Sequence, residues 1–136
     1  MSVKVKRIIC IILCLFILAT SSCVTFADEK SGWTEDKTHY FYEDGEVATG
    51  IVVINKKFYC FNQNGKYLVQ KTAKIRKAAK YEKPFANLKK FIGQPNKSKY
   101  YTSCYGNGQD GVLTYDNFTI YTFKPAKGKE IFMNAE

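Results

Sequence analysis

The 136-residue chain has little of what metal and acid–base chemistry require, because it contains one His and one Trp. A single His leaves little material for a zinc site or a Ser-His-Asp arrangement. The chain is also too short for a barrel enzyme or a full dinucleotide-binding domain. Disorder throughout is excluded, because 46% of the residues are hydrophobic and 15% aromatic. The length allows one ordinary domain or two very small ones.

Residues 1–27 have the pattern of a cleaved signal peptide. A basic start without acids precedes an uncharged stretch at residues 8–19, as in the n- and h-regions of such peptides. As a helix this stretch would span about 18 Å, short of the ~30 Å hydrocarbon core of a bilayer. Thr25 and Ala27 suit the −3 and −1 positions of a signal-peptidase site, so we expect cleavage after Ala27. The alternatives are an uncleaved anchor and a lipoprotein at Cys23, which lacks the usual Leu three residues earlier.

Cleavage after Ala27 would leave two of the five cysteines, Cys60 and Cys104. An even number of cysteines in an oxidising compartment is consistent with a disulfide between them. The other interpretation is two separate buried thiols that pack as small apolar groups. Nothing local in the sequence brings the two positions together, so both interpretations stay open.

Positive charge is concentrated in the middle of the chain. Residues 66–99 hold eleven Lys or Arg and a single acid, Glu82, whereas the segments on either side are weakly acidic. We interpret residues 69–82 as a basic linker or short helix, whose charge is either simply solvated or attracts a polyanion. Nucleic acid is not the expected partner, because the block matches no nucleic-acid-binding motif. The candidate polyanion contacts are Lys71, Lys74, Arg76, Lys77 and Lys80.

Two aromatic segments before this block repeat one pattern. Each ends in Asp-Gly or Asn-Gly, at residues 44–45 and 64–65, and these pairs favour tight turns because Gly tolerates positive φ. The β-branched run 51–54 and the aromatic run 58–61 suit the two strands of a hairpin. An isolated hairpin is marginal in water, so each unit needs a neighbour. The period near 20 predicts a small β-solenoid.

The first unit reads Gly32-Trp33, Tyr40-Phe41-Tyr42-Glu43-Asp44-Gly45, and the second Phe58-Tyr59-Cys60-Phe61-Asn62-Gln63-Asn64-Gly65. Over residues 31–68 the chain resembles the cell-wall-binding repeat of Gram-positive surface proteins, the choline-binding-type repeat. The resemblance implies a run of β-hairpins at a bacterial surface. In well-known members, aromatic cages between repeats hold the choline of teichoic acids by cation–π contact.

This copy departs from the family pattern at several rings. The second unit has Ile51 where Trp is expected, and Phe58 and Cys60 replace Trp and Tyr. The first hairpin has Thr38 and His39 where Trp and Tyr are expected. A three-ring cage is therefore incomplete at the family positions, and its nearest candidates are Trp33, Tyr40 and Tyr59. Choline binding, contact with another wall glycopolymer and a packing role stay open for Trp33, Tyr40, Phe41, Phe58, Tyr59 and Phe61.

Residues 83–136 predict a small α+β module. Pro84 suits a first helical turn, and Gly93 offers a left-handed C-cap. Residues 116–117 predict a two-residue hairpin turn. The order predicts one helix packed on an antiparallel meander. The predicted helix buries one face made of Phe85, Leu88, Phe91 and Ile92, and the predicted strands are residues 99–105, 112–115, 118–123 and 130–134.

This second half also resembles a small exported module of Gram-positive bacteria, through Gly93-Gln-Pro, Ser103-Cys104, residues 108–111 and residues 115–122. The helix-then-sheet order is similar to one half of the β-lactamase-inhibitor-protein-like fold, an analogy that fixes no function.

An enzyme is not expected, and neither is a metal or cofactor. Cys104 has no His nearby in the sequence, and Asp110 and Asp116 occupy turn positions that favour Asp for backbone reasons. The prediction is a mainly β, secreted or wall-associated, non-catalytic surface protein. Its hairpin repeats would contact wall glycopolymer or teichoic acid, helped by the basic block. The alternative is a secreted protein-binding or inhibitor-like module, or a lipoprotein, whose C-terminal sheet binds a protein.

Overall fold

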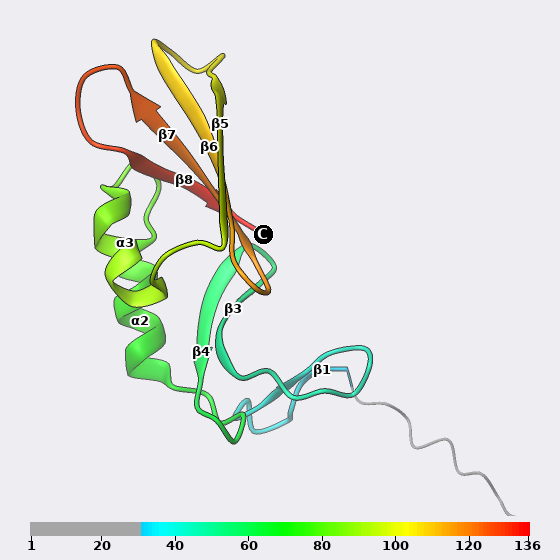
Figure 1. The fold of residues 1–136 in the computed structure, drawn as a ribbon. Helices are drawn as coiled ribbons and strands as arrows, with labels where there is room; N and C mark the ends of the chain where they lie inside the picture. The colour runs from blue at the N-terminus through cyan, green and yellow to red at the C-terminus, as the bar shows by residue number, and fades with distance from the viewer. Residues whose placement is uncertain (1–30) are drawn as a thin grey trace, which may run out of the picture.

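The computed structural model describes residues 31–136, so the predicted signal peptide and Cys23 lie outside the described residues. The fold is mainly β: two small hairpins are followed by two helices and a four-stranded antiparallel meander, in the order β5-β6-β7-β8 (Figure 1). The elements are β1 (Gly32–Trp33), β2 (Tyr40–Phe41), β3 (Gly50–Ile54), β4 (Lys57–Phe61), α2 (Val69–Ala78), α3 (Phe85–Ile92), β5 (Lys97–Thr102), β6 (Gly108–Thr114), β7 (Thr119–Pro125) and β8 (Ile131–Ala135).

The two hairpin units share one turn geometry, as their sequences predict. In each, the turn glycine donates its N–H to the carbonyl three residues earlier, Gly45 to Tyr42 and Gly65 to Asn62, both at 3.0 Å. Both glycines have positive φ, 81° and 77°, which a side chain would disfavour. Within residues 31–136 the second unit is followed by a helix and not by a third hairpin, so the β-solenoid is not shown.

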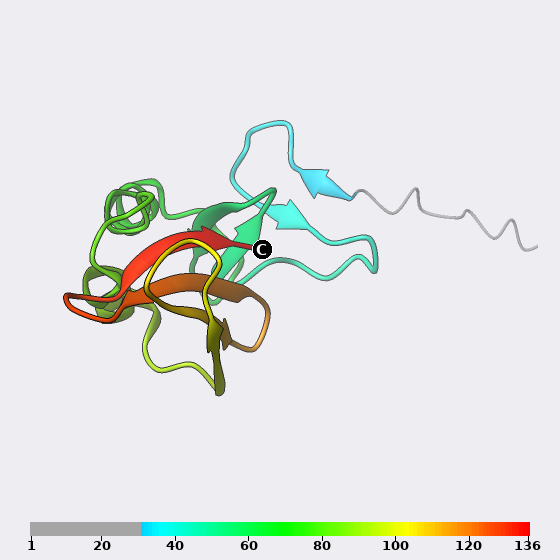
Figure 2. The same cartoon turned by 90° about the horizontal axis from the view of Figure 1, so that it is seen from above.

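The β3–β4 hairpin is buried on both faces. Along β4, Phe58 and Cys60 face the C-terminal half, whereas Tyr59 and Phe61 face the first hairpin. This alternation follows from the two-residue period of a strand. The first hairpin, β1–β2, lies at one end of the molecule, away from the helices (Figure 2).

Helix α2 covers the outer edge of β4. The N–H of Leu68 donates to the Cys60 carbonyl at 2.7 Å, and the Thr72 hydroxyl accepts from the Cys60 N–H at 2.9 Å. One turn further along, Arg76 Nε donates to the Phe58 carbonyl at 2.8 Å. Residues four apart share a helix face, so these three positions satisfy successive outward-pointing groups of the strand. A covered edge cannot pair with another hairpin.

The α+β module follows the predicted order. Helix α3 has the predicted span and ends at Gly93 with φ of 75°, although Pro84 occupies the N-cap and not the first turn. The predicted turn at residues 116–117 is confirmed by the bond from Tyr115 N–H to the Phe118 carbonyl at 2.9 Å. All four predicted strands are present, with bounds shifted by one to four residues at either end.

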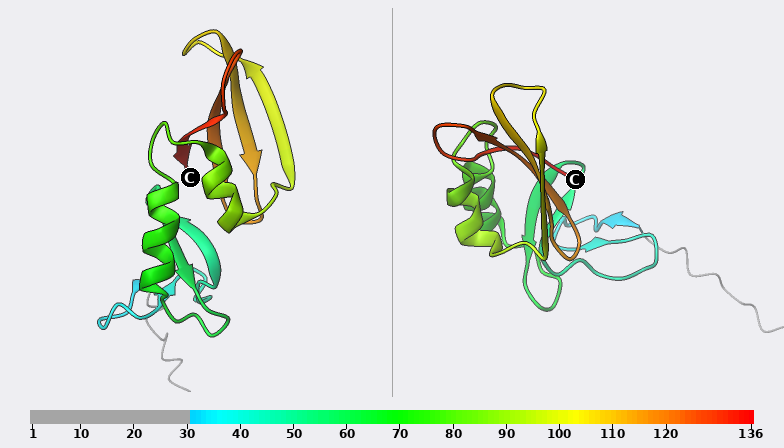
Figure 3. Two further views of the ribbon diagram at one scale, coloured as in Figure 1. Left: turned by 90° about the vertical axis from the view of Figure 1, so that its left-hand side faces the viewer. Right: turned by 45° about the horizontal axis from the view of Figure 1, so that its top comes forward.

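The two helices confirm one expectation and correct another. The short-helix alternative for residues 69–82 is confirmed by α2, which packs beside β4 while α3 lies against the sheet (Figure 3). Phe85 and Leu88 are buried, at 3% and 0% exposure, but Phe91 is 38% exposed and not part of the core face. The ring of Phe91 lies beside α2, a neighbour that the periodicity of a single helix does not reveal.

The main hydrophobic core joins the second hairpin, both helices and the meander. The sequence analysis predicted separate units at residues 31–68 and 83–136, yet side chains from both units share this core. Burying each large apolar side chain contributes about 1.5–3 kcal/mol. The two parts therefore fold against each other. The buried members are Phe58, Cys60, Ile75, Phe85, Leu88, Leu113, Tyr115, Phe118, Ile120, Phe132 and Ala135.

Candidate functional site

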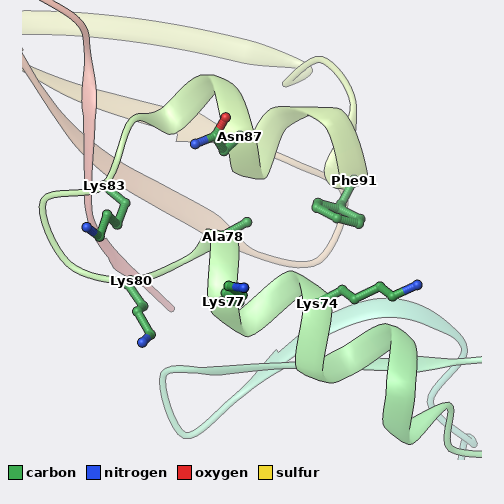
Figure 4. A pocket seen from close by; sticks show the side chains of 7 residues that line it. All are labelled: Lys74, Lys77, Ala78, Lys80, Lys83, Asn87 and Phe91. Atoms are coloured by element: carbon green, nitrogen blue, oxygen red, sulfur yellow. The ribbon is translucent and has the colours of Figure 1, made fainter.

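A basic groove of about 570 Å³ lies between α2 and α3 (Figure 4). Four of the residues that line it are lysines and none is acidic. Phe91 projects from α3 toward α2, and Lys74 extends beneath it. The groove thus combines charged lysine side chains with the apolar surface of Ala78 and Phe91, which is here called its floor. The lining residues, here called the basic groove, are Lys74, Lys77, Ala78, Lys80, Lys83, Asn87 and Phe91.

The lysines of α2 point outward because its other side is committed to packing. Thr72 and Ile75 are the buried residues of this helix, at 1% and 0% exposure. A rotation of about 100° per residue places Lys74 and Lys77 on the opposite, solvated side. The chain after α2 adds Lys80, and the segment that leads into α3 adds Lys83.

The acid nearest to these lysines in the sequence is bonded elsewhere. Glu82 lies between Lys80 and Lys83, yet its carboxylate accepts a hydrogen bond from the Tyr105 hydroxyl at 2.5 Å. That bond raises the pKa of the Tyr105 phenol. Glu82 is not among the residues that line the basic groove, whose charge is therefore not neutralised from within.

The basic groove has an electrostatic cost. Lys74 and Lys77 are three residues apart on one helix, and such like-charged pairs destabilise a helix by about 0.2–0.5 kcal/mol. The position of Lys77 in the last turn of α2 offsets part of this cost, because cations are favourable near a helix C-terminus. A bound polyanion would remove the remaining repulsion.

The predicted polyanion contacts do not stay together. Lys74, Lys77 and Lys80 line the basic groove, whereas Lys71 lines two neighbouring hollows. Arg76 turns to the opposite side of α2, toward β4. The sequence analysis did not predict the other four residues of the groove, namely Ala78, Lys83, Asn87 and Phe91.

Arg76 is a packing residue and not a surface contact. Its guanidinium carbon lies 4.3 Å from the centroid of the Tyr59 ring, a cation–π contact. Its Nε donates to the Phe58 carbonyl, while its buried Nη2 has no hydrogen-bond partner among the described residues. The interpretation of Arg76 as a polyanion contact is therefore corrected: its charge holds α2 on the hairpin.

The aromatic rings of the two hairpins meet around Trp33. The centroid of its ring lies 5.0 Å from that of Tyr59, 5.2 Å from Tyr67, and 5.6 Å from both Tyr40 and Phe61. The three nearest cage candidates, Trp33, Tyr40 and Tyr59, are thus brought together. Tyr40 and Tyr59 each pack against the Trp33 ring, and a face of Tyr59 already holds the Arg76 cation.

The other candidate rings divide by exposure. Phe58 and Phe61 are each 2% exposed, so neither offers a surface to a polymer. Phe58 packs on Phe118 and Phe132 in the main core, with centroids 5.7 and 6.2 Å away. Phe41 lines hollows of about 580 and 600 Å³ on the first hairpin. Rings at this end of the molecule remain available to a ligand.

Three residues of the second unit that differ from the predicted repeat pattern lie in the protein interior. Ile51, Phe58 and Cys60 all pack against the main core. On that face the hairpin meets α2 and the meander, so the residues fit a protein interior and not an aromatic cage. The first-unit departures, Thr38 and His39, lie in a loop where the Thr38 hydroxyl bonds His39 Nδ1 at 2.8 Å.

Cys60 and Cys104 are free thiols in the structure, so the disulfide interpretation is wrong. Cys60 is 1% exposed, and burial raises the pKa of its thiol while the nearby Lys71 opposes that shift. Cys104 is exposed, at the end of the meander's first hairpin, so the interpretation of two buried thiols holds only for Cys60.

Asp36 organises the loop between β1 and β2. The hydroxyls of Thr34 and Thr38 donate to its carboxylate at 2.6 and 2.8 Å. These bonds favour the charged form and lower the pKa of Asp36 to about 2. The first hairpin therefore depends on a polar loop as well as on ring packing.

Comparison with protein-family models, with curated proteins and with solved structures finds no match to this chain. Among residues 31–136 no helix combines the length and the apolar character needed to cross a bilayer. The same part of the chain holds no group of three His, Cys, Asp or Glu side chains placed to bind a metal ion.

Proposed function

We propose that the protein is exported, has no catalytic role and associates with the anionic polymers of a bacterial cell wall. The basic groove carries this proposal, because four lysines line one hollow without an acid among them. The resemblance of residues 31–68 to cell-wall-binding repeats supports the same location. Wall teichoic acid is the polyanion that such a location would supply.

The basic groove would attract the polymer from a distance, and the first hairpin would contact it directly. Clustered positive charge raises the local concentration of an anionic polymer before contact. Trp33, Tyr40 and Phe41, which line the hollows of the first hairpin, would then contact the sugars of the same polymer. Each contact is weak, but contacts on one long polymer add through effective concentration.

Retention on purified walls tests this function. The protein recovered from an exporting Gram-positive host is mixed with walls at low ionic strength, then with walls stripped of teichoic acid. We expect retention on intact walls, loss of most retention on stripped walls, and release by ~0.5 M salt because exposed charges are screened. Equal binding to both preparations, or none to either, would contradict the proposal.

A second candidate function is protein binding through the edge of the meander. All six residues of β5 are exposed, and Tyr101 and Tyr105 are 53% and 55% exposed. An open edge strand can accept a partner strand by β-augmentation, although its two lysines oppose such pairing. Protease treatment of the walls separates the two functions, because it would abolish retention that depends on a wall protein and spare binding to polymer.

A further inference from the structure

We propose that the basic groove is a binding site for a sugar-bearing polyol-phosphate polymer, the chemistry of wall teichoic acid. The lysines would bind phosphodiester groups, and Phe91 would lie under a sugar ring. This inference rests on the proposed function and adds to it a location, a ligand class and a division of roles.

The charge of the groove selects an anion that repeats. Lys74, Lys77 and Lys80 follow one another at three-residue spacing, and Lys83 continues the row. Each ammonium offers three donors and acts as a compact point charge that suits phosphate oxygens. A single phosphate ion would satisfy part of this row, whereas a chain of phosphodiesters can neutralise all of it.

The floor of the groove selects a ligand with an apolar face as well. Phe91 is 38% exposed at the end of the groove where Lys74 lies (Figure 4), although Phe85 and Leu88 on the same helix are buried. Exposed aromatic surface beside cations fits a ligand that alternates phosphate with a ring. Asn87, which is also on α3, offers its side-chain amide to the hydroxyls of a sugar.

The size of the groove sets how much polymer it holds. Its volume of about 570 Å³ is in the range of small-molecule sites. It would hold a short stretch of polymer while the rest of the chain continues along the surface. Lys71 lies next to this path, in the hollow that shares Lys74 with the groove.

The test compares two charge-matched double variants of the protein recovered after export. Lys74→Gln with Lys77→Gln removes two groove charges, whereas Lys97→Gln with Lys99→Gln removes two exposed charges of β5 from the same basic block. Binding of purified, glycosylated poly(glycerol phosphate) is measured by titration calorimetry at low salt. We expect about tenfold weaker binding for the groove variant and about twofold for the β5 variant.

Phe91→Leu tests the floor of the groove. It keeps an apolar side chain and removes the ring. We expect it to bind glycosylated polymer about threefold more weakly than wild type and to bind the unglycosylated polymer as wild type does. Equal affinity of wild type and Phe91→Leu for glycosylated polymer would overturn the stacking role.

Three results would overturn the site itself. Equal losses of affinity in the two double variants would mean that the polymer responds to the total positive charge and not to the groove. Equal affinity for single-stranded oligonucleotide would mean an unselective polyanion surface, and equal affinity for phosphatidylglycerol vesicles would mean a membrane surface. Unchanged far-UV circular dichroism and an unreactive Cys60 thiol serve as the check that each variant is folded.

The same variants separate this inference from the proposed function. Undiminished retention of the groove variant on intact walls would reject the groove and leave wall association standing. Binding of soluble polymer in the groove without retention on walls would reject wall association and leave the site standing.

Discussion

The two hairpins have the same turns but different surroundings. The first hairpin has strands of two residues and packs mainly through rings, whereas the second has strands of five residues and is buried on both faces. Helix α2 also covers the outer edge of β4. The comparison teaches that two hairpins with the same turn can have different roles, because the residues on the second face of β4 pack into a shared core.

The face of β4 that packs into the main core is expected to contribute strongly to stability. Phe58→Ala removes a buried ring that contacts Phe118 and Phe132. We expect the free energy of unfolding to fall by about 3–5 kcal/mol, in a urea titration followed by circular dichroism. Tyr101→Ala, at a ring that is 53% exposed, is the matched control and should change it by less than about 0.5 kcal/mol. A loss below about 1 kcal/mol for Phe58→Ala would contradict the shared core.

Trp33→Ala should act on the first hairpin and spare the rest. It removes four ring contacts, and each aromatic pair adds about 0.5–1.5 kcal/mol. We expect hydrogen exchange of the amides in residues 32–48 to accelerate, because the free energy of local opening should fall by about 2 kcal/mol. Protection of β6 and β7 should not change, and equal acceleration there would mean that the first hairpin and the meander open together.

Substitutions of the sequence neighbours Arg76 and Lys77 should differ strongly in their effect on stability. Arg76→Gln loses the Phe58 carbonyl contact and the Tyr59 cation–π contact, so we expect a loss of about 1–3 kcal/mol in stability. Lys77→Gln relieves like-charge repulsion and should leave stability within about 0.5 kcal/mol of wild type. Thermal unfolding of the two variants measures the contrast, which would disappear if both side chains were merely solvated.

The stability of the first hairpin at low pH depends on Asp36. Its pKa is depressed to about 2 in the folded state, against about 4 in an unfolded chain. A carboxyl group whose pKa is lowered by folding stabilises the folded state at pH values above its pKa in the unfolded chain. That stability is lost as the pH falls from about 4 to about 2. Fluorescence of Trp33 should change over this window in wild type. In Asp36→Asn it should already be altered at pH 6 and change less on acidification.

Much of the fold could be predicted because its signals are local. Helix α3 ends at Gly93, and the β6–β7 turn lies at residues 116–117, where the sequence places them. Helix α2 was left open because only Thr72 and Ile75 are buried along it, and one of these is polar. Its stability comes from β4, a strand that precedes it in the chain.

The candidate site was harder to predict because it is made by neighbours. A count of charges finds Lys74 and Lys77 but also includes Arg76, whose partners Phe58 and Tyr59 lie 18 and 17 residues earlier. Helical periodicity assigns Phe91 to the core, because it does not reveal that a second helix lies alongside. A sequence shows which residues carry charge, and the packing of the elements decides which of them share a surface.

Amide chemical-shift mapping tests the central claim most directly. Isotope-labelled protein is titrated with soluble glycosylated poly(glycerol phosphate) at low salt. We expect the largest shifts in residues 74–91 of α2 and α3, smaller ones around Trp33, and none above noise in β5. Largest shifts in β5, or no shifts at millimolar repeat concentration, would contradict the account.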